Sequence, residues 1–182
     1  MEGLIVRSDK HYTYEDYLKL DDDQEYEVIG GKLIVVPKPR LYHQKIADDI
    51  LTEIKVFLRQ NSIGIAYSNV DVVFGKQVVS PDIIFISNER LSIATETNVQ
   101  GAPDLVVEVL SPSTKKYDRK EKWKLYYENG VKEYWIFDPL TQLVETFISG
   151  AKDWERAGIY DDEDILTSPL LPGLAIELKK VF

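Results

Sequence analysis

The segment from Leu105 to Leu110 reads Leu-Val-Val-Glu-Val-Leu, so apolar residues point to both sides of any strand that it forms. A half-exposed strand alternates between apolar and polar residues, whereas a run of this kind is typical of a strand buried on both faces. The chain must therefore place further layers on both sides of a central sheet. Its 182 residues, of which 44% are hydrophobic, are enough for one ordinary domain with such a core.

The remaining periodicity predicts helices and strands around this run. Helices are expected from Thr13 onward, over 41–60 with a stripe through Ile46, Ile50 and Ile54, and over 116–128. Strands are expected over 25–29 and 32–36 around a Gly30-Gly31 turn, over 65–74, over 78–86 with an interruption at Pro81, and over 133–137, 143–148 and 154–160. The tail over 170–182 is expected to pack back on the domain through Leu174, Ile176 and Leu178. The sequence therefore predicts a single α/β (α+β) domain over 1–182, with an N-terminal arm over 1–12 and a mixed central sheet flanked by helices.

The composition excludes several classes of protein. Because there is no cysteine, disulfides, zinc thiolate sites, iron–sulfur clusters and cysteine nucleophiles are absent. No apolar run approaches the roughly 18 residues that a transmembrane helix requires, so no membrane association is expected. The first seven residues lack the pattern of a signal peptide, and we expect a cytoplasmic protein.

The net charge of −9 disfavours a protein that gathers nucleic acid through a long-range basic field. It does not exclude a local basic groove. The densest basic stretch comprises Lys115, Lys116, Arg119, Lys120 and Lys124. These side chains either line such a groove or form the solvated side of the predicted second long helix.

Two acidic residues lie in strongly apolar surroundings. Glu108 interrupts the run 105–110, and Asp82 follows Pro81 directly before Ile83–Ile86. An ionised carboxylate is costly there unless it is paired with a cation or bound to a metal. Neighbouring strands could bring both carboxylates onto one Mg²⁺ or Mn²⁺ ion, since these ions prefer oxygen ligands. Alternatively, each acid pairs with an internal Lys or Arg, or caps a loop.

Two other segments carry candidate side chains. Glu27 precedes the Gly-Gly turn, on a strand face that belongs either to a site or to solvent. Asp118, Lys122 and Tyr126 are spaced four apart and share one helix face. This face either aims a lysine at the carboxylates, where it could position water or meet a phosphate, or carries a local Asp118–Lys122 pair in solvent.

Other catalytic signatures are weak or absent. His43 opens the helix expected over 41–60, where a surface or capping role is predicted, and His11 lies in the N-terminal arm without an expected role. Two histidines and no cysteine disfavour a zinc hydrolase. The chain contains neither a Gly-x-Ser-x-Gly element nor a phosphate-binding Gly-x-x-x-x-Gly-Lys-Ser/Thr loop.

Taken together, these residues resemble a known family. The ordered set consists of Pro81-Asp82, the segment Asp104–Thr114, then Asp118, Lys122 and Tyr126, and the segment Gly130–Pro139, while Glu27–Leu33 and His43 fit the family's N-terminal half. The set resembles the Uma-type family of restriction-endonuclease-like proteins, within the PD-(D/E)XK nuclease superfamily. The resemblance extends from about Tyr12 to the end of the chain.

The resemblance implies a restriction-endonuclease-like core that holds Mg²⁺ or Mn²⁺ at the sheet. Asp82 and Glu108 would be the motif acids and metal ligands, together with the backbone carbonyl of Val109. Glu27 would be the acid from the N-terminal part and would complete the metal shell directly or through water. The superfamily pattern expects a lysine two residues after the motif acid, and this chain has Leu110 there. Lys122 is the natural substitute, with Lys124 as the fallback.

We therefore expect a metal-dependent endonuclease that cleaves phosphodiester bonds in DNA. The cation would activate water and stabilise the developing charge, and Lys122 would orient the water or the phosphate. A homodimer is expected, since a symmetric dimer readily cuts both strands of a duplex. The alternatives are a catalytically degenerate binding or regulatory domain of the same fold, and a nuclease acting on RNA or on a smaller phosphodiester.

Overall fold

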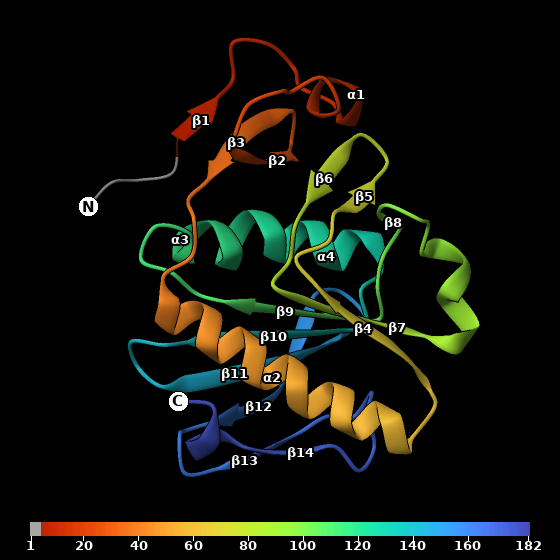
Figure 1. Ribbon diagram of the computed structural model, residues 1–182, viewed down its shortest axis with the longest axis vertical. Coiled ribbons are helices and arrows are strands. Elements are labelled where there is room, and N and C mark those ends of the chain that lie inside the picture. The colour runs from red at the N-terminus through yellow and green to blue at the C-terminus, as the bar shows by residue number, and fades with distance from the viewer. Residues whose placement is uncertain (1–4) are drawn as a thin grey trace.

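The computed structural model describes residues 5–182, so the first four residues of the expected N-terminal arm lie outside the described part. A six-stranded central sheet runs in the order β12-β11-β10-β9-β7-β4 (Figure 1). Its strands are β4 (Gly64–Ser68), β7 (Ile83–Ser87), β9 (Leu105–Val109), β10 (Glu133–Asp138), β11 (Leu143–Ser149) and β12 (Trp154–Tyr160). The sheet is mixed, because β9 and β10 are parallel while the other neighbouring strands are antiparallel.

A second, smaller sheet lies beside the central one, at the top of Figure 1. Its order is β1-β3-β2-β6-β5-β8, with β1 (Ile5–Arg7), β2 (Glu25–Ile29), β3 (Lys32–Val36), β5 (Val72–Phe74), β6 (Gln77–Val79) and β8 (Val99–Gln100). The β2–β3 hairpin turns at Gly30 and Gly31, whose φ angles of 57° and 74° suit a two-residue turn of this kind. The short helix α1 (Tyr14–Tyr17) packs against this sheet, and Thr13 caps it as predicted.

Both faces of the central sheet are covered, as the apolar run of β9 predicts. Helix α2 (Leu41–Gln60) buries Ile46, Ile50 and Ile54 on the face that carries Val107. The opposite face, with Val106, is covered by α3 (Lys115–Tyr117), a π-helical turn η2 (Asp118–Lys122) and α4 (Trp123–Asn129). Because strand side chains alternate, Glu108 points toward this second helical layer. No helix within residues 5–182 is long and apolar enough to span a membrane.

The C-terminal segment packs on the same face as α2. It contains β13 (Ile165–Thr167), β14 (Ala175–Glu177) and a 3₁₀ turn over Leu178–Lys180, and it buries Leu174, Ile176 and Leu178 as predicted. The buried Glu133 anchors it by accepting hydrogen bonds from Ser168 Oγ and the Leu170 N–H, each at 3.0 Å. A further 3₁₀ turn, Asn88–Ile93, links β7 to β8.

The continuous strand predicted over 65–74 is wrong, because it divides between the two sheets, and the interruption predicted at Pro81 within 78–86 is a second such division. β4 belongs to the central sheet and β5 to the small one, and Asn69 between them has a left-handed φ of 49°. β6 and β7 divide in the same way at Pro81, which has no N–H with which to continue a ladder. Asp82 therefore lies where the chain enters the central sheet.

The stripe on α2 provides a test of this packing. Ile50 is fully buried, whereas Val56 on the same helix is 43% exposed. We expect Ile50→Ala to lower the free energy of unfolding by about 2–5 kcal/mol, since it removes buried methyl groups and leaves a cavity. Val56→Ala should change it by less than about 0.5 kcal/mol. Urea denaturation of both variants measures the difference, and similar losses would contradict the packing.

Candidate active site

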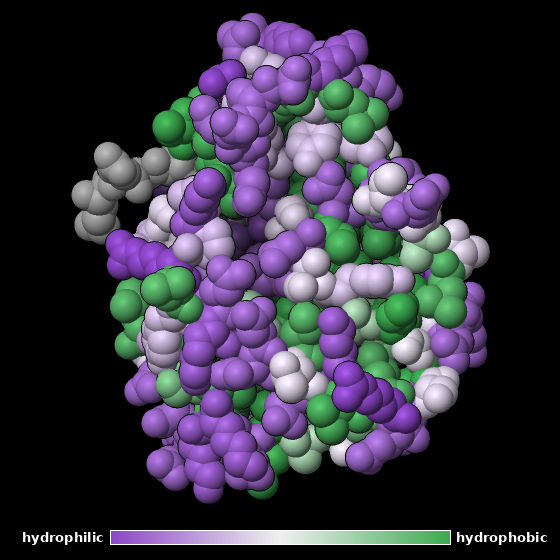
Figure 2. Space-filling view, viewed as in Figure 1, coloured by the Kyte–Doolittle hydropathy of each residue, from purple (hydrophilic) through white to green (hydrophobic). Residues whose placement is uncertain are grey.

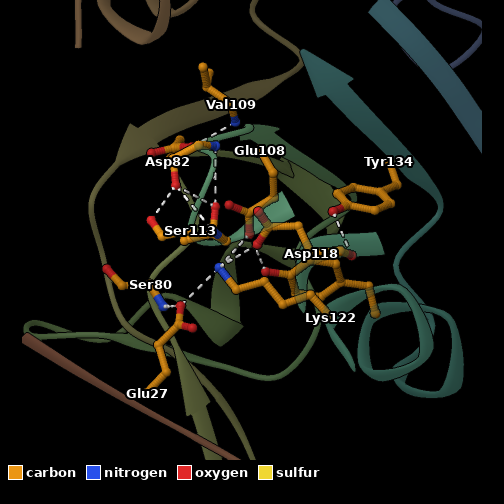
Figure 3. Close-up of polar contacts among 12 residues, drawn as sticks. Glu27, Ser80, Asp82, Glu108, Val109, Ser113, Asp118, Lys122 and Tyr134 are labelled. Atoms are coloured by element: carbon orange, nitrogen blue, oxygen red, sulfur yellow. Dashed lines mark hydrogen bonds and ion pairs between the residues drawn. The ribbon is translucent and has the colours of Figure 1, made fainter. Parts of the chain in front are cut away.

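Asp82 and Glu108 come to the same end of the central sheet. β7 and β9 pair with Ile83 opposite Val107, so the next positions along this register are Asp82 and Glu108. The Val109 N–H donates to Asp82 Oδ2 at 2.7 Å and fixes this carboxylate against β9 (Figure 3). The structure thus brings together the two acids that the sequence predicts as partners.

The ammonium group of Lys122 contacts three carboxylates at this end of the sheet. Its Nζ lies 2.9 Å from Glu27 Oε1, 3.0 Å from Glu108 Oε1 and 3.7 Å from Asp118 Oδ1. The Tyr126 hydroxyl donates to the same Glu108 oxygen at 2.6 Å. Lys122 is only 5% exposed and Glu108 only 4%. The predicted pairing of Asp118 with Lys122 is present, but it lies inside the protein and not in solvent.

The helical segment that carries these side chains is not a regular α-helix. Asp118–Lys122 form a π-helical turn between α3 and α4, and Tyr134 Oη donates to the Asp118 carbonyl at 3.4 Å. Such turns are rare and occur frequently at functional sites. The spacing of four residues nevertheless directs Lys122 and Tyr126 to one oxygen of Glu108. The predicted common face is therefore confirmed, and the helix predicted over 116–128 is present, with a π-helical turn in its middle.

Glu27 reaches the site from the small sheet. It lies on β2, where Tyr26 and Val28 pack into the core of that sheet and Glu27 points to the other side. Its Oε1 accepts the Ser80 N–H at 3.0 Å, two residues before Asp82. Glu27 is 2% exposed, so the interpretation of this strand face as solvated is wrong.

The site holds more acidic groups than basic ones. Burial raises the pKa of Glu108 well above its usual range, and it raises the pKa of Asp118 to about 6. Burial lowers the pKa of Lys122, but the carboxylates of Glu108 and Glu27 outweigh this effect and leave it well above its usual value. The lysine therefore stays charged, and the surplus of acidic groups favours either a bound proton or a further cation.

His43 lies in the same site, so the predicted surface or capping role is wrong. Its Nε2 is 2.8 Å from the Val109 carbonyl oxygen and 3.4 Å from Asp82 Oδ2, and its Nδ1 is buried without a hydrogen-bond partner among residues 5–182. Burial lowers the pKa of His43, but Asp82 and the Val109 carbonyl raise it and prevail. The sequence contained a signal for this inward placement, because the apolar stripe through Ile46 and Ile50 extends one helical turn back to His43.

Two other positions lie outside this group. Lys124, the fallback lysine, is 72% exposed and pairs with Glu128 at 3.7 Å. Leu110 occupies the strand position where the superfamily pattern expects a lysine, and it is buried in the core beneath α4. Of these candidates, Lys122 alone contacts the acids within the described residues 5–182.

The carboxylate and carbonyl oxygens at this end of the sheet suit a hard divalent cation, although the ammonium group of Lys122 lies between Glu27 and Glu108. In the described range 5–182, no three Asp, Glu, His or Cys side chains form a group that could hold a metal ion. The possible ligand atoms near Asp82 are its own carboxylate oxygens, His43 Nε2 and the Val109 carbonyl oxygen. Carboxylate and carbonyl oxygens are the ligands that Mg²⁺ and Mn²⁺ prefer, and the surplus of acidic groups would favour such an ion.

Comparison with known proteins identifies the family. The model of the Uma2 family, described as "Putative restriction endonuclease", matches residues 14–179, which include every site residue described above. The chain belongs to the Uma2 family. The resemblance inferred from the sequence is therefore confirmed, and the family supports a nuclease-like function.

Two similar proteins extend this comparison. The "Uncharacterized protein sll1609" of Synechocystis sp. (strain ATCC 27184 / PCC 6803 / Kazusa) is 22% identical over 157 residues, which cover 83% of this chain and 89% of that protein. The crystal structure of "a putative nuclease belonging to DUF820" from Anabaena variabilis ATCC 29413 matches with a TM-score of 0.78 and 23% identity, over 93% of this chain and 97% of that chain. The structural match confirms the predicted fold class.

Removal of the buried ammonium group should destabilise the protein. Lys122→Met leaves Glu27, Glu108 and Asp118 buried without their cation, and we expect a loss of about 3–5 kcal/mol at pH 8. The loss should shrink at pH 5, because Glu108 and Asp118, whose pKa values are raised by burial, then take up protons. The matched change Lys124→Met should alter the free energy of unfolding by less than about 0.5 kcal/mol. Urea denaturation at both pH values tests this, and equal losses for the two variants would refute it.

Asp118 predicts a pH dependence of stability. Its folded pKa of about 6 lies above its ordinary value of 3.8, so the folded protein binds a proton more tightly than the unfolded chain does. Ionisation of Asp118 therefore costs stability as the pH rises from about 4 through 6. The free energy of unfolding of Asp118→Asn, relative to that of the wild type, should rise by up to about 3 kcal/mol between pH 4 and pH 8, at about 1.4 kcal/mol per pKa unit. The exposed Glu128→Gln should show no such trend in the same denaturation series.

Proposed function

We propose that this protein is a metal-dependent endonuclease that hydrolyses phosphodiester bonds in DNA. The observation that carries the proposal is the distance of 3.0 Å between Lys122 Nζ and Glu108 Oε1. A lysine beside the motif acid is what the superfamily pattern requires, and Leu110 cannot supply it from β9. The helical Lys122 therefore supports a competent site over a degenerate one.

Asp82, Glu108 and the carbonyl of Val109 would hold Mg²⁺ or Mn²⁺. When bound, such an ion lowers the pKa of a water molecule and neutralises charge on the phosphate. The Val109 N–H keeps Asp82 in place through its bond of 2.7 Å. Tyr126 and Lys122 engage Glu108 Oε1, which leaves Oε2 available to a cation.

Lys122 would orient the attacking water or the scissile phosphate. Glu27 holds this ammonium group at 2.9 Å and is itself fixed by the Ser80 N–H. We assign Glu27 mainly to the positioning of Lys122, and to the cation through water. Because both groups are buried, their attraction is little weakened by solvent, and the lysine has few alternative positions.

The charges on the surface favour local contacts with DNA. Within the predicted basic stretch, Lys115 pairs with Asp138 at 2.7 Å, Arg119 pairs with Glu145, and Lys124 pairs with Glu128. Lys116 and Lys120 are exposed. Figure 2 shows a face on which hydrophilic and hydrophobic areas alternate, and the net charge of −9 gives no long-range attraction for a duplex, so the contacts would be local. We further propose a homodimer, in which two sites act on the two strands.

A nuclease for a small substrate would need a larger pocket. A cavity of about 190 Å³ lies between the β2–β3 hairpin and η2, and Ile29, Lys32, Tyr117 and Glu121 are among its lining residues. Small-molecule sites usually measure about 300–1,000 Å³. This cavity is smaller than that range and contains none of the candidate site residues, so it does not support the alternative of a small phosphodiester substrate.

Supercoiled plasmid with Mn²⁺ or Mg²⁺ tests the proposed activity. We expect the wild type to nick and linearise it, and Glu108→Gln to lower the rate at least about 100-fold, since this substitution removes a charged cation ligand. The same substitution at the exposed Glu128 is the matched control and should leave the rate unchanged.

Three results would point elsewhere. Cleavage of single-stranded RNA or bis(p-nitrophenyl) phosphate without cleavage of plasmid would indicate the alternative substrates. Binding of plasmid without cleavage of any substrate would indicate a degenerate binding domain. Cleavage that survives Glu108→Gln would show that the activity does not arise from this site.

A further inference from the structure

The proposed function leaves the role of His43 open, although two oxygen atoms lie close to its ring. His43 Nε2 lies 2.8 Å from the Val109 carbonyl oxygen and 3.4 Å from Asp82 Oδ2. These groups come from the start of α2, the end of β9 and the residue before β7. The imidazole thus faces two oxygens that the proposed function assigns to a cation.

We infer that His43 is itself a ligand of the cation, through Nε2, beside Asp82 and the Val109 carbonyl. This inference rests on the proposed metal site and names a nitrogen ligand that the proposal does not contain. It also explains why a polar ring occupies the first turn of the buried stripe on α2, where the following turns carry Ile46 and Ile50.

The spacing of the three atoms supports this inference. Adjacent ligands of an octahedral ion lie about 3 Å apart, because each is roughly 2.1 Å from the metal. The separations of 2.8 Å and 3.4 Å bracket this value. Without a metal, a proton on Nε2 is shared with the Val109 and Asp82 oxygens. A cation could replace this proton without a large movement of the chain.

The other ring nitrogen is compatible with this role. A neutral imidazole that binds a metal through Nε2 carries its proton on Nδ1. His43 Nδ1 is buried, and no group within residues 5–182 donates a hydrogen bond to it. No donor there competes for Nδ1, but the Nδ1–H of this tautomer also has no acceptor among these residues, so the support for the inference comes from the Nε2 side of the ring.

A nitrogen ligand affects the choice of metal. Mg²⁺ prefers an all-oxygen shell, whereas imidazole suits transition metals such as Mn²⁺ better. A site with His43, Asp82 and a carbonyl should therefore bind Mn²⁺ more tightly than Mg²⁺. Replacing the imidazole by a carboxylate should reduce this preference.

Electron spin-echo spectroscopy of the Mn²⁺-loaded full chain tests the inference directly. A directly bound imidazole produces a nitrogen hyperfine coupling, which changes when the histidines are labelled with ¹⁵N. The chain contains two histidines, so His11→Ala leaves His43 as its sole histidine. We expect the coupling and its isotope shift in the wild type and in His11→Ala. This arm of the test does not depend on the folding of a His43 variant.

Variants at position 43 provide a second measurement. We expect His43→Ala to abolish the nitrogen coupling and to weaken Mn²⁺ binding at least about tenfold, with a smaller effect on Mg²⁺. His43→Asp should restore binding without the coupling and lower the ratio of Mn²⁺ to Mg²⁺ affinity. A purely structural role of His43 predicts no such change of metal preference. Titration of free Mn²⁺ by electron paramagnetic resonance measures the affinities.

The outcomes separate this inference from the proposed function. If Mn²⁺ binds and plasmid is cleaved but no histidine nitrogen couples to the metal, the inference is overturned and the nuclease stands. If the coupling is present but no phosphodiester is cleaved, His43 is a ligand and the nuclease proposal fails. If the wild type binds no Mn²⁺, both are overturned.

Discussion

The ammonium group of Lys122 holds three separate parts of the chain in one place. It contacts Glu27 on β2 of the small sheet, Glu108 on β9 of the central sheet and Asp118 on its own π-helical turn. A buried cation needs partners on several sides, and buried carboxylates need a cation, so each group restricts the positions of the others. The relative placement of the two sheets and the second helical layer therefore depends on this cluster.

This cluster also determines what the site can do. With Leu110 in the core, the lysine next to the motif acid comes from the following helix, and the π-helical turn brings it to Glu108. Asp82 is fixed at the end of β9 by the Val109 N–H and lies against His43. The site therefore has an end organised around Lys122 and an end organised around the Val109 peptide. The proposed chemistry requires both ends to act on one phosphate.

Much of this arrangement could be predicted from local patterns. The apolar run of β9 predicts a doubly covered sheet, and the isolation of Glu108 and Asp82 within apolar segments marks both acids. The spacing of four between Asp118, Lys122 and Tyr126 predicts their common face. The boundary between the sheets could not be predicted, because Asn69 and Pro81 can indicate breaks within 65–74 and 78–86, but nothing in these segments shows that β5 and β6 join a different sheet. His43 was missed because a single polar residue at a helix start usually faces solvent.

The sequence by itself determined the fold class, because burial and periodicity act through neighbours along the chain, and its ordered motifs determined the family. The apolar surroundings of Glu108 and Asp82 marked both as candidate acids. Only the tertiary structure decided which residues meet. Glu27 and Lys122 are far apart in sequence, and their contact arises because the small sheet packs over the helical layer. The same holds for His43 and Val109, which meet where α2 begins and β9 ends. Contacts between distant segments depend on the packing of whole layers, which no local pattern encodes.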